Sequence, residues 1–282
     1  MKRKVINIII IALVLIGVML LVYPYVSYRL SERGQTYVVQ QYDDSLAKMT
    51  AQQMEEEWER ARAYNESLVT SVLYDPFASG QEDMDAEYLS LLDIAENGVM
   101  CHIEIPKIKV GLPVFHGVSL STLEKGVGHL EGSSLPVGGT GTHAVMTAHT
   151  GLNSAKLFTD LVEMKIGDEF YIYTLDQILA YRVDNILVVE PEDVGALSMV
   201  EGKDYVTLVT CTPYGINSHR LLVRGIRVDY TPEEIKQAIA DTDTVLSNET
   251  IMLYAGIVLL ILLIIAILIV TQIKKRRGTK TR

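Results

Sequence analysis

Two long runs of mainly apolar residues lie one near each end of the 282-residue chain. Residues 5–23 contain no charged side chain, and neither do residues 251–273. Because a helix needs about 20 apolar residues to cross the hydrocarbon core of a bilayer, both runs are predicted to be transmembrane helices. Basic residues lie outside each run, at positions 2–4 and 274–277. This charge pattern predicts that both ends face the cytoplasm and that the chain between them faces outward.

A cleaved secretion signal is the alternative interpretation of the first run. The apolar stretch is longer than the usual core of a signal peptide, and the following residues, YPYVSYRL, contain no small-x-small cleavage motif. The sequence therefore favours a retained membrane anchor.

Residues 38–68 follow a helical period. Apolar side chains recur every three to five positions among many charged ones, which is typical of an amphipathic helical region. The simplest interpretation is a spacer with one solvated face and one face packed on a neighbouring domain. The periodic positions are Val39, Tyr42, Leu46, Met49, Met54, Trp58, Ala61, Tyr64 and Leu68.

The pattern changes after the turn-rich stretch YDPFASGQEDMD. Short runs rich in Val, Ile and Tyr then follow one another, separated by Gly and Pro: HIEIP, AVMTAH, EFYIYT, AYRVDNILVVE, DYVTLVTC and RLLVRGIRV. Runs of this length and spacing predict a mainly β core, either closed into a barrel or folded as a sandwich.

Charge narrows the class of protein. Sixteen of the 25 Lys and Arg residues and all 35 Asp and Glu residues lie within residues 24–250, a formal charge of −19 for that part. This excess of negative charge argues against nucleic acid as a partner. The length of the region allows one sizeable domain and an accessory segment.

The candidate chemistry lies where β-like runs end. Cys211, one of only two cysteines, closes the run DYVTLVTC, and His149 closes THAVMTAH. Arg220 opens the run RLLVRGIRV, so an antiparallel return through TPYGINSH would bring it level with Cys211. Side chains at strand ends can leave the core and meet a substrate. The pattern predicts that the three side chains meet at one rim.

These three residue types together suit acyl transfer. A free thiol is only a few per cent thiolate at neutral pH, and a nearby imidazolium or guanidinium stabilises the thiolate. Histidine can also carry a proton. A guanidinium with five donors suits the oxyanion that forms on the attacked carbonyl.

A structural disulfide between Cys101 and Cys211 is the alternative, since an outward-facing domain permits one. Such a disulfide would leave Cys211 without the free thiol that a nucleophile needs. Without it, Cys101 is expected to be a small buried side chain.

Longer motifs resemble a known family. TLVTC with Arg220 nine residues later, and the distant His149 in MTAHTGL, resembles the sortases. TCTPYGINSHRLLVRG together with GVGHLEGSSLPVGGTGTHAV is similar to their pilus-assembling class C, and the likeness runs from about residue 74 to 228. The resemblance implies an eight-stranded sortase β-barrel, with Cys211 as nucleophile, His149 as general acid/base and Arg220 stabilising substrate and oxyanion. It implies no metal and no organic cofactor.

The reaction implied by the resemblance is transpeptidation. Cys211 would cleave an LPxTG-type sorting signal after Thr, and the amine of a pilin lysine would resolve the thioester. The implied partners are pilin subunits, met on the outer face of a Gram-positive type membrane. Two alternatives remain: a sortase that anchors proteins to cell-wall peptide, and a non-catalytic receptor or adhesion module held by two membrane helices.

A candidate lid precedes the barrel. In the family that the chain resembles, an Asp-Pro-aromatic motif on a flexible segment covers the active site, and Asp75, Pro76 and Phe77 (the DPF motif) match it. Pro76 favours an extended Asp75, so the segment can cross a groove without forming a helix. Asp75 is expected to pair with Arg220 as an exposed, weak ion pair, and Phe77 to rest on Cys211. A plain turn between helix and barrel is the alternative.

Some positions depart from the family pattern. A small residue and then an aromatic are expected where Cys101 and His102 stand, and an arginine where Thr150 stands. His143 and His219 are expected to lie nearest the site, and no role is assigned to either. The remaining histidines show no tight metal-ligand spacing in the sequence. They are His102, His116, His129, His143 and His219.

The predicted organisation has seven parts. These are a cytoplasmic end with the first transmembrane helix (1–23), a helical segment (24–73), a lid segment and linker (74–97), a catalytic β-barrel (98–230), a juxtamembrane segment (231–250), a second transmembrane helix (251–273) and a basic cytoplasmic tail (274–282).

Overall fold

The computed structural model describes residues 2–68, 73–78, 84–152 and 154–231, with the single residues 233 and 256. The chain divides into two compact units, residues 1–230 and 231–282. Nearly all of the second unit lies outside the described residues, so the description below concerns the first.

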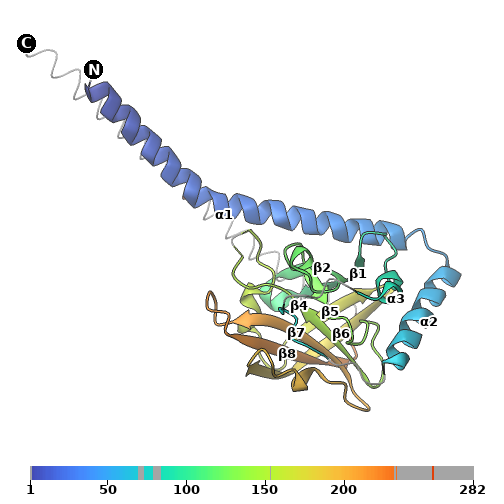
Figure 1. The fold of residues 1–282 in the computed structure, drawn as a ribbon. Coiled ribbons are helices and arrows are strands. Elements are labelled where there is room, and N and C mark those ends of the chain that lie inside the picture. The colour runs from blue at the N-terminus through green and yellow to red at the C-terminus, as the bar shows by residue number, and fades with distance from the viewer. Residues whose placement is uncertain are drawn as a thin grey trace, which may run out of the picture. The chain divides into compact units, whose positions relative to one another are not determined.

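A closed barrel of eight strands forms the centre of the first unit (Figure 1). Around the barrel the order is β1-β2-β3-β4-β7-β8-β6-β5, with parallel pairing only for β2 with β3 and β4 with β7. The prediction of a mainly β, eight-stranded barrel is confirmed, and closure decides between the barrel and the sandwich. The strands are β1 (Val99–Ile105), β2 (Val110–His116), β3 (Val127–His129), β4 (Thr142–Thr147), β5 (Glu169–Thr174), β6 (Gln177–Val189), β7 (Asp204–Thr212) and β8 (His219–Val228).

Short helical turns lie in the connections between strands and before the barrel. They are α3 (Ala86–Ser90), α4 (Leu120–Leu123), η1 (Pro106–Ile108), η2 (Thr159–Glu163) and η3 (Gly195–Leu197).

Two long helices precede the barrel, α1 (Lys2–Leu46) and α2 (Ala51–Ser67). The predicted helical region 38–68 is helical at both ends but broken between them. The break has a local cause, because Thr50 starts α2 with a capping box: its hydroxyl accepts from the backbone of Gln53, and the Gln53 side chain accepts from the backbone of Thr50. The periodicity does not reveal this break, since apolar spacing continues across it.

Within the described part of the chain, no helix has both the length and the apolarity needed to cross a membrane. The predicted span over residues 251–273 lies outside the described residues, apart from Gly256. Both spans stay predictions.

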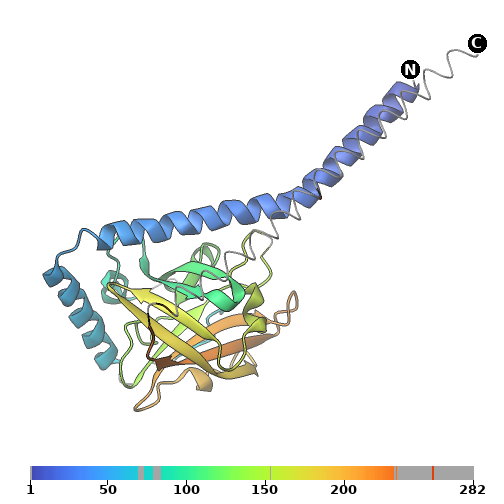
Figure 2. The same cartoon turned by 180° about the vertical axis from the view of Figure 1, so that it is seen from behind.

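The end of α1 and α2 pack one face on the barrel, as predicted for this amphipathic region (Figures 1 and 2). Tyr42 is 1% exposed, and its hydroxyl donates to the Met100 carbonyl (3.2 Å) and accepts from the Leu175 N–H (2.9 Å). Trp58 is likewise buried and donates its indole N–H to Asp176 (2.9 Å). Buried polar tips with partners of this kind fix the helices in one position.

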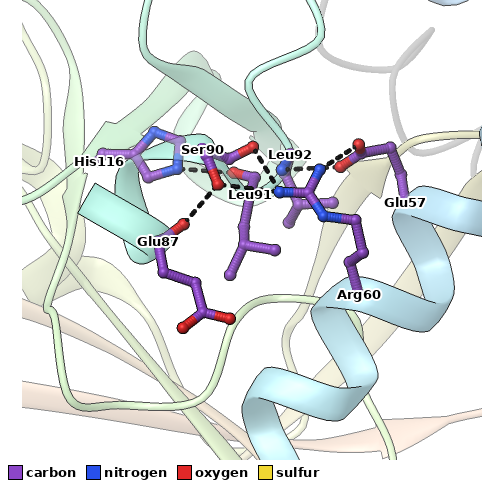
Figure 3. A network of polar contacts seen from close by, with 7 residues as sticks. All are labelled: Glu57, Arg60, Glu87, Ser90, Leu91, Leu92 and His116. Atoms are coloured by element: carbon purple, nitrogen blue, oxygen red, sulfur yellow. Dashed lines mark hydrogen bonds and ion pairs between the residues drawn. The ribbon is translucent and has the colours of Figure 1, made fainter. Parts of the chain in front are cut away.

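Residues 90–92, shortly before β1, are held from two sides (Figure 3). Arg60 of α2 bonds Glu57 (2.6 Å) and donates to the Ser90 hydroxyl (2.9 Å). On the barrel side, Nε2 of His116 lies 2.7 Å from the Leu91 carbonyl oxygen. The segment that carries the DPF motif is therefore followed by a stretch of chain that is bound to α2 and to the barrel.

The hydrophobic residues form two clusters. The larger fills the barrel and reaches under α2. The smaller includes Val145, Val209 and Leu222 from the strands that carry the candidate site, and Tyr74 and Phe77 pack against it. The DPF motif thus lies on an apolar support beside β7 and β8.

Candidate active site

Cys211 and Arg220 face each other across an antiparallel pair. Cys211 is the penultimate residue of β7 and Arg220 the second residue of β8, and they are direct register partners. Residues directly opposite have Cβ atoms about 4.5–5.5 Å apart, so thiol and guanidinium share one small space. Both side chains are mostly buried, each residue being 9% exposed. The predicted register of the hairpin is confirmed.

His149 reaches the same rim from the other side of Cys211. β4 pairs with β7 in parallel, and the register runs as far as Thr147 opposite Val209. Continuing it by two residues places His149 level with Cys211. The Ala148 N–H donates to the Val209 carbonyl (3.2 Å), which holds the chain in register just past the end of β4. The order across the rim is thus histidine, cysteine, arginine.

Burial and charge act on the Cys211 thiol in opposite directions. Burial raises its pKa, the Arg220 guanidinium lowers it, and the Asp75 carboxylate raises it again, so the net pKa is above that of an ordinary thiol. The thiol is therefore mostly protonated while Asp75 is present. Removal of that carboxylate would favour the thiolate.

His149 is half-buried, and burial lowers its pKa while Glu124 opposes the shift. Sequence reasoning missed Glu124, the C-cap residue directly after α4. Glu124 lies shortly before β3, and β3 is the neighbour of β4, the strand that leads to His149. Only the strand order of the barrel reveals this proximity.

Asp75 binds Arg220 through two parallel hydrogen bonds. Nε of Arg220 donates to Oδ1 (2.7 Å) and a terminal nitrogen donates to Oδ2 (2.6 Å). Burial alone would lower the pKa of Arg220, but the bonds to Asp75 and the nearby Cys211 raise it overall. The side chains of Asp75 and Arg220 are only 14% and 11% exposed. The pairing was predicted, whereas its description as an exposed pair is wrong, because the DPF motif itself covers it.

Phe77 contacts the residues on both sides of Cys211. Its ring centroid lies 5.7 Å from that of His149, and the Arg220 guanidinium carbon lies 5.0 Å from it. The prediction placed Phe77 on Cys211 itself. Pro76 stands in a turn, with the Phe77 N–H donating to Oδ1 of Asp75 (3.3 Å), so the motif is a turn laid over the rim.

The second cysteine is remote from this chemistry. Cys101 and Cys211 are both free, so the disulfide alternative is wrong. Cys101 is fully buried in β1, and burial raises its pKa. Its neighbour His102, which stands where the family pattern has an aromatic residue, stacks on Tyr173 with ring centroids 4.4 Å apart.

Of the two histidines expected nearest the site, His219 adjoins it and His143 does not. His143 lies at the opposite end of β4, paired with Tyr205, because six residues of extended strand separate it from His149, about 20 Å. It is a buried structural residue between the Ser198 carbonyl (2.9 Å) and the Thr207 hydroxyl (2.7 Å). His219 does adjoin the site, and its Nε2 lies 3.3 Å from Glu190.

Among the described residues, no group of three or more His, Cys, Asp or Glu side chains could hold a metal ion. Thiol, imidazole and guanidinium on a barrel rim, under an ion-paired cover, define a cysteine-dependent acyl-transfer site.

Comparisons with known proteins identify the family. A family model of the Sortase domain matches residues 103–228. The solved structure of sortase C-1 from Actinomyces oris is 47% identical, over 64% of this chain and 99% of that one, with a TM-score of 0.61. Sortase C1 from Streptococcus agalactiae is 41% identical, over 69% of this chain and 100% of that one, with a TM-score of 0.63. The chain belongs to the sortase family of cysteine transpeptidases, and the two solved structures just described are class C sortases.

Curated relatives match over shorter lengths. Sortase A of Streptococcus agalactiae is 33% identical over 39% of this chain and 45% of its own length. Sortase A of Bacillus anthracis is 28% identical over 59% of this chain and 80% of its own length. The chain thus spans about half of the first of these relatives.

Proposed function

We propose that this chain cleaves LPxTG-type sorting signals after Thr and joins the resulting acyl group to a lysine of a pilin subunit. Cys211 is the nucleophile, His149 the general acid/base and Arg220 the oxyanion and substrate stabiliser. The observation that carries the proposal is the direct register of Cys211 with Arg220, with His149 level on the neighbouring parallel strand.

In the acylation step, the Cys211 thiol transfers its proton to His149 and the sulfur attacks the threonine carbonyl. The carbonyl oxygen becomes an oxyanion, which the Arg220 guanidinium stabilises. The C–N bond then breaks, and His149 returns the proton to the leaving amine. A thioester on Cys211 remains.

In the second step, a lysine amine attacks the thioester carbonyl. The attacking nitrogen then gives up a proton, the C–S bond breaks, and the departing Cys211 sulfur takes up that proton. An isopeptide bond now joins the two proteins. The solved structure of Streptococcus pneumoniae Sortase C concerns catalysis and pilin substrate specificity, which supports pilins as the substrates here.

The DPF motif opposes both steps while it lies over the rim. Asp75 occupies the two guanidinium donors that an oxyanion would need. Displacement of the motif by substrate therefore precedes acylation and gates the enzyme.

We infer from the apolar runs and flanking basic residues that the enzyme is a two-pass membrane protein. The catalytic domain then faces outward from a Gram-positive type envelope, where it meets secreted pilins.

The test is mass spectrometry of the purified protein after incubation with an LPxTG-type peptide. A thioester mass on Cys211, absent in Cys211→Ala, is expected. Competition between a pilin lysine peptide and a cell-wall peptide amine then separates pilus assembly from wall anchoring. Pilus polymerisation that survives Cys211→Ala would refute the assignment.

A further inference from the structure

A groove lies between helix α1 and the barrel, near the start of β3. Its volume is about 460 Å³, and it is lined by Gln35 and Gln41 of α1, by Asn97 and Phe115, and by Glu124 and Lys125. The amide of Gln35 donates to the Lys125 carbonyl (3.3 Å), which ties α1 to this part of the barrel. Glu124 is the only carboxylate lining the described groove.

The strand register brings this groove to the active-site rim. β3 is antiparallel to β4, with Gly128 opposite Thr147. Continuing the register by two residues places Gly126 opposite His149, so Glu124, directly after α4, lies just outside the same rim. Gly126 packs closely on β2 and leaves no room for a side chain, since a Cβ there would lie 2.7 Å from the Pro113 carbonyl oxygen. Burial lowers the pKa of His149 and the Glu124 carboxylate raises it, which agrees with this placement.

The two flanks of Cys211 have different chemistry. On the β8 flank, Arg220 is the group that polarises a carbonyl, and the DPF motif covers that flank. On the β4 flank, His149 is the group that can take a proton from an attacking amine. An amine must therefore approach from the His149 side, which is where the groove with Glu124 lies.

We propose that this groove binds the acceptor substrate, a lysine side chain, with Glu124 as the anionic contact for its ammonium group. The inference rests on the proposed transpeptidation and names the site for its second substrate. Amide oxygens of the groove, such as those of Gln35 and Asn97, add polar acceptors for a cationic chain.

The chemistry balances without a further reactant. The bound ammonium first loses one proton to neutral His149, and the free amine attacks the thioester carbonyl. The attacking nitrogen then loses its second proton, the C–S bond breaks, and the departing Cys211 sulfur takes up that proton. His149 passes its own proton to water. Glu124 contacts the nucleophile before reaction, and it neither gains nor loses a proton overall.

The test separates acylation from aminolysis in the full-length protein. Cys211 is first acylated with an LPxTG-type peptide, and the thioester is then offered either a lysine peptide or hydroxylamine, which is small and uncharged at neutral pH. Glu124→Gln should lower the lysine rate about tenfold, the scale of one nearby charge pair. Acylation and hydroxylamine rates should change much less, because there Glu124 acts only through its effect on the pKa of His149. The difference should shrink at about 0.5 M salt.

Two further variants probe the groove itself. Lys125→Gln, which removes the opposite charge at the adjacent position, should raise the lysine rate. Gly34→Phe fills the groove from α1, where a Cβ meets nothing within 4 Å, and should slow the lysine peptide but not hydroxylamine.

Equal lysine rates in the parent and Glu124→Gln would overturn the inference. So would an equal loss with hydroxylamine, since that result would mean damage to His149 rather than loss of amine binding. If the parent protein forms no thioester, the proposed function fails and this inference fails with it. Normal acylation with unaltered aminolysis overturns the inference alone.

Discussion

Replacement of Asp75 by alanine should expose Cys211 to thiol reagents. Asp75 makes two charge-assisted hydrogen bonds to Arg220, at 2.7 and 2.6 Å, in a setting where both side chains are mostly buried. A hydrogen bond to a charged group contributes about 1.5–3 kcal/mol, and in the open state water replaces part of it. A net loss of about 2 kcal/mol would raise the open population about 30-fold, since about 1.4 kcal/mol is tenfold.

The assay is the second-order rate of Cys211 modification, followed by mass spectrometry with peptide mapping. Mapping avoids replacing Cys101, which is fully buried and would leave a cavity. Asp44→Ala is the matched control, because Asp44 is exposed on α1. The melting temperature should fall by no more than about 4–8 °C, the shift that 2 kcal/mol gives in a domain of this size, since the DPF motif covers the rim and not the barrel interior.

Loss of Asp75 also acts on the pKa of Cys211, because the carboxylate raises it. The two effects separate by pH. A lowered pKa moves the midpoint of the labelling profile to lower pH, whereas opening multiplies the rate at every pH. Equal labelling of the parent and Asp75→Ala across the profile would show that Asp75 does not guard the thiol. An equal gain in Asp44→Ala would refute the ion-pair explanation.

Further predictions follow from other contacts. Arg220→Ala should leave a thiol at Cys211 but slow acyl transfer by about two to three orders of magnitude, measured by single-turnover kinetics; unaltered rates would remove Arg220 from the mechanism. Tyr42→Phe should lower the free energy of unfolding by about 1–3 kcal/mol in urea, because the buried Leu175 N–H loses its acceptor, with catalysis unchanged. Burial lowers the pKa of His102 to about 4, so the folded protein binds fewer protons than the unfolded chain between pH 4 and about 6.5. Its stabilising contribution, up to about 3 kcal/mol, is therefore present above pH 6.5 and lost as the pH falls toward 4. His102→Phe should flatten this slope in urea titrations, and an unchanged slope would contradict the assignment. Protease added to intact protoplasts should spare tags at both termini, and cleavage of either tag would refute the predicted topology.

The hairpin of the candidate site was predictable because its information is local. Cys211 and Arg220 are nine residues apart, and an antiparallel return has few registers that keep both apolar faces inward. The structure has that register. Closure into a barrel was not predictable from the β-like runs alone, since short strands with turn signals serve barrels and sandwiches equally.

Other features depend on contacts between distant segments. Glu124 stands near His149 only because β3 lies between β2 and β4, an order that alternation of apolar residues does not encode. His143 was expected near the site because it precedes His149 by six residues. In an extended strand, however, six residues span about 20 Å, so His143 lies far from the site. The buried state of the Asp75–Arg220 pair likewise arises from the cover that the DPF motif provides.

The direct pairing of Cys211 with Arg220 has a consequence for engineering. The ladder between β7 and β8 sets the separation of the two backbones that carry thiol and guanidinium. The connecting residues 213–218 add one backbone contact, since the Asn217 carbonyl accepts from the Arg220 guanidinium (3.3 Å). Loops of different length or composition could therefore be exchanged at this point while the reactive pair keeps its spacing. Substrate preference could in this way be altered by transplanting a short connection, with the catalytic geometry inherited unchanged from the strands.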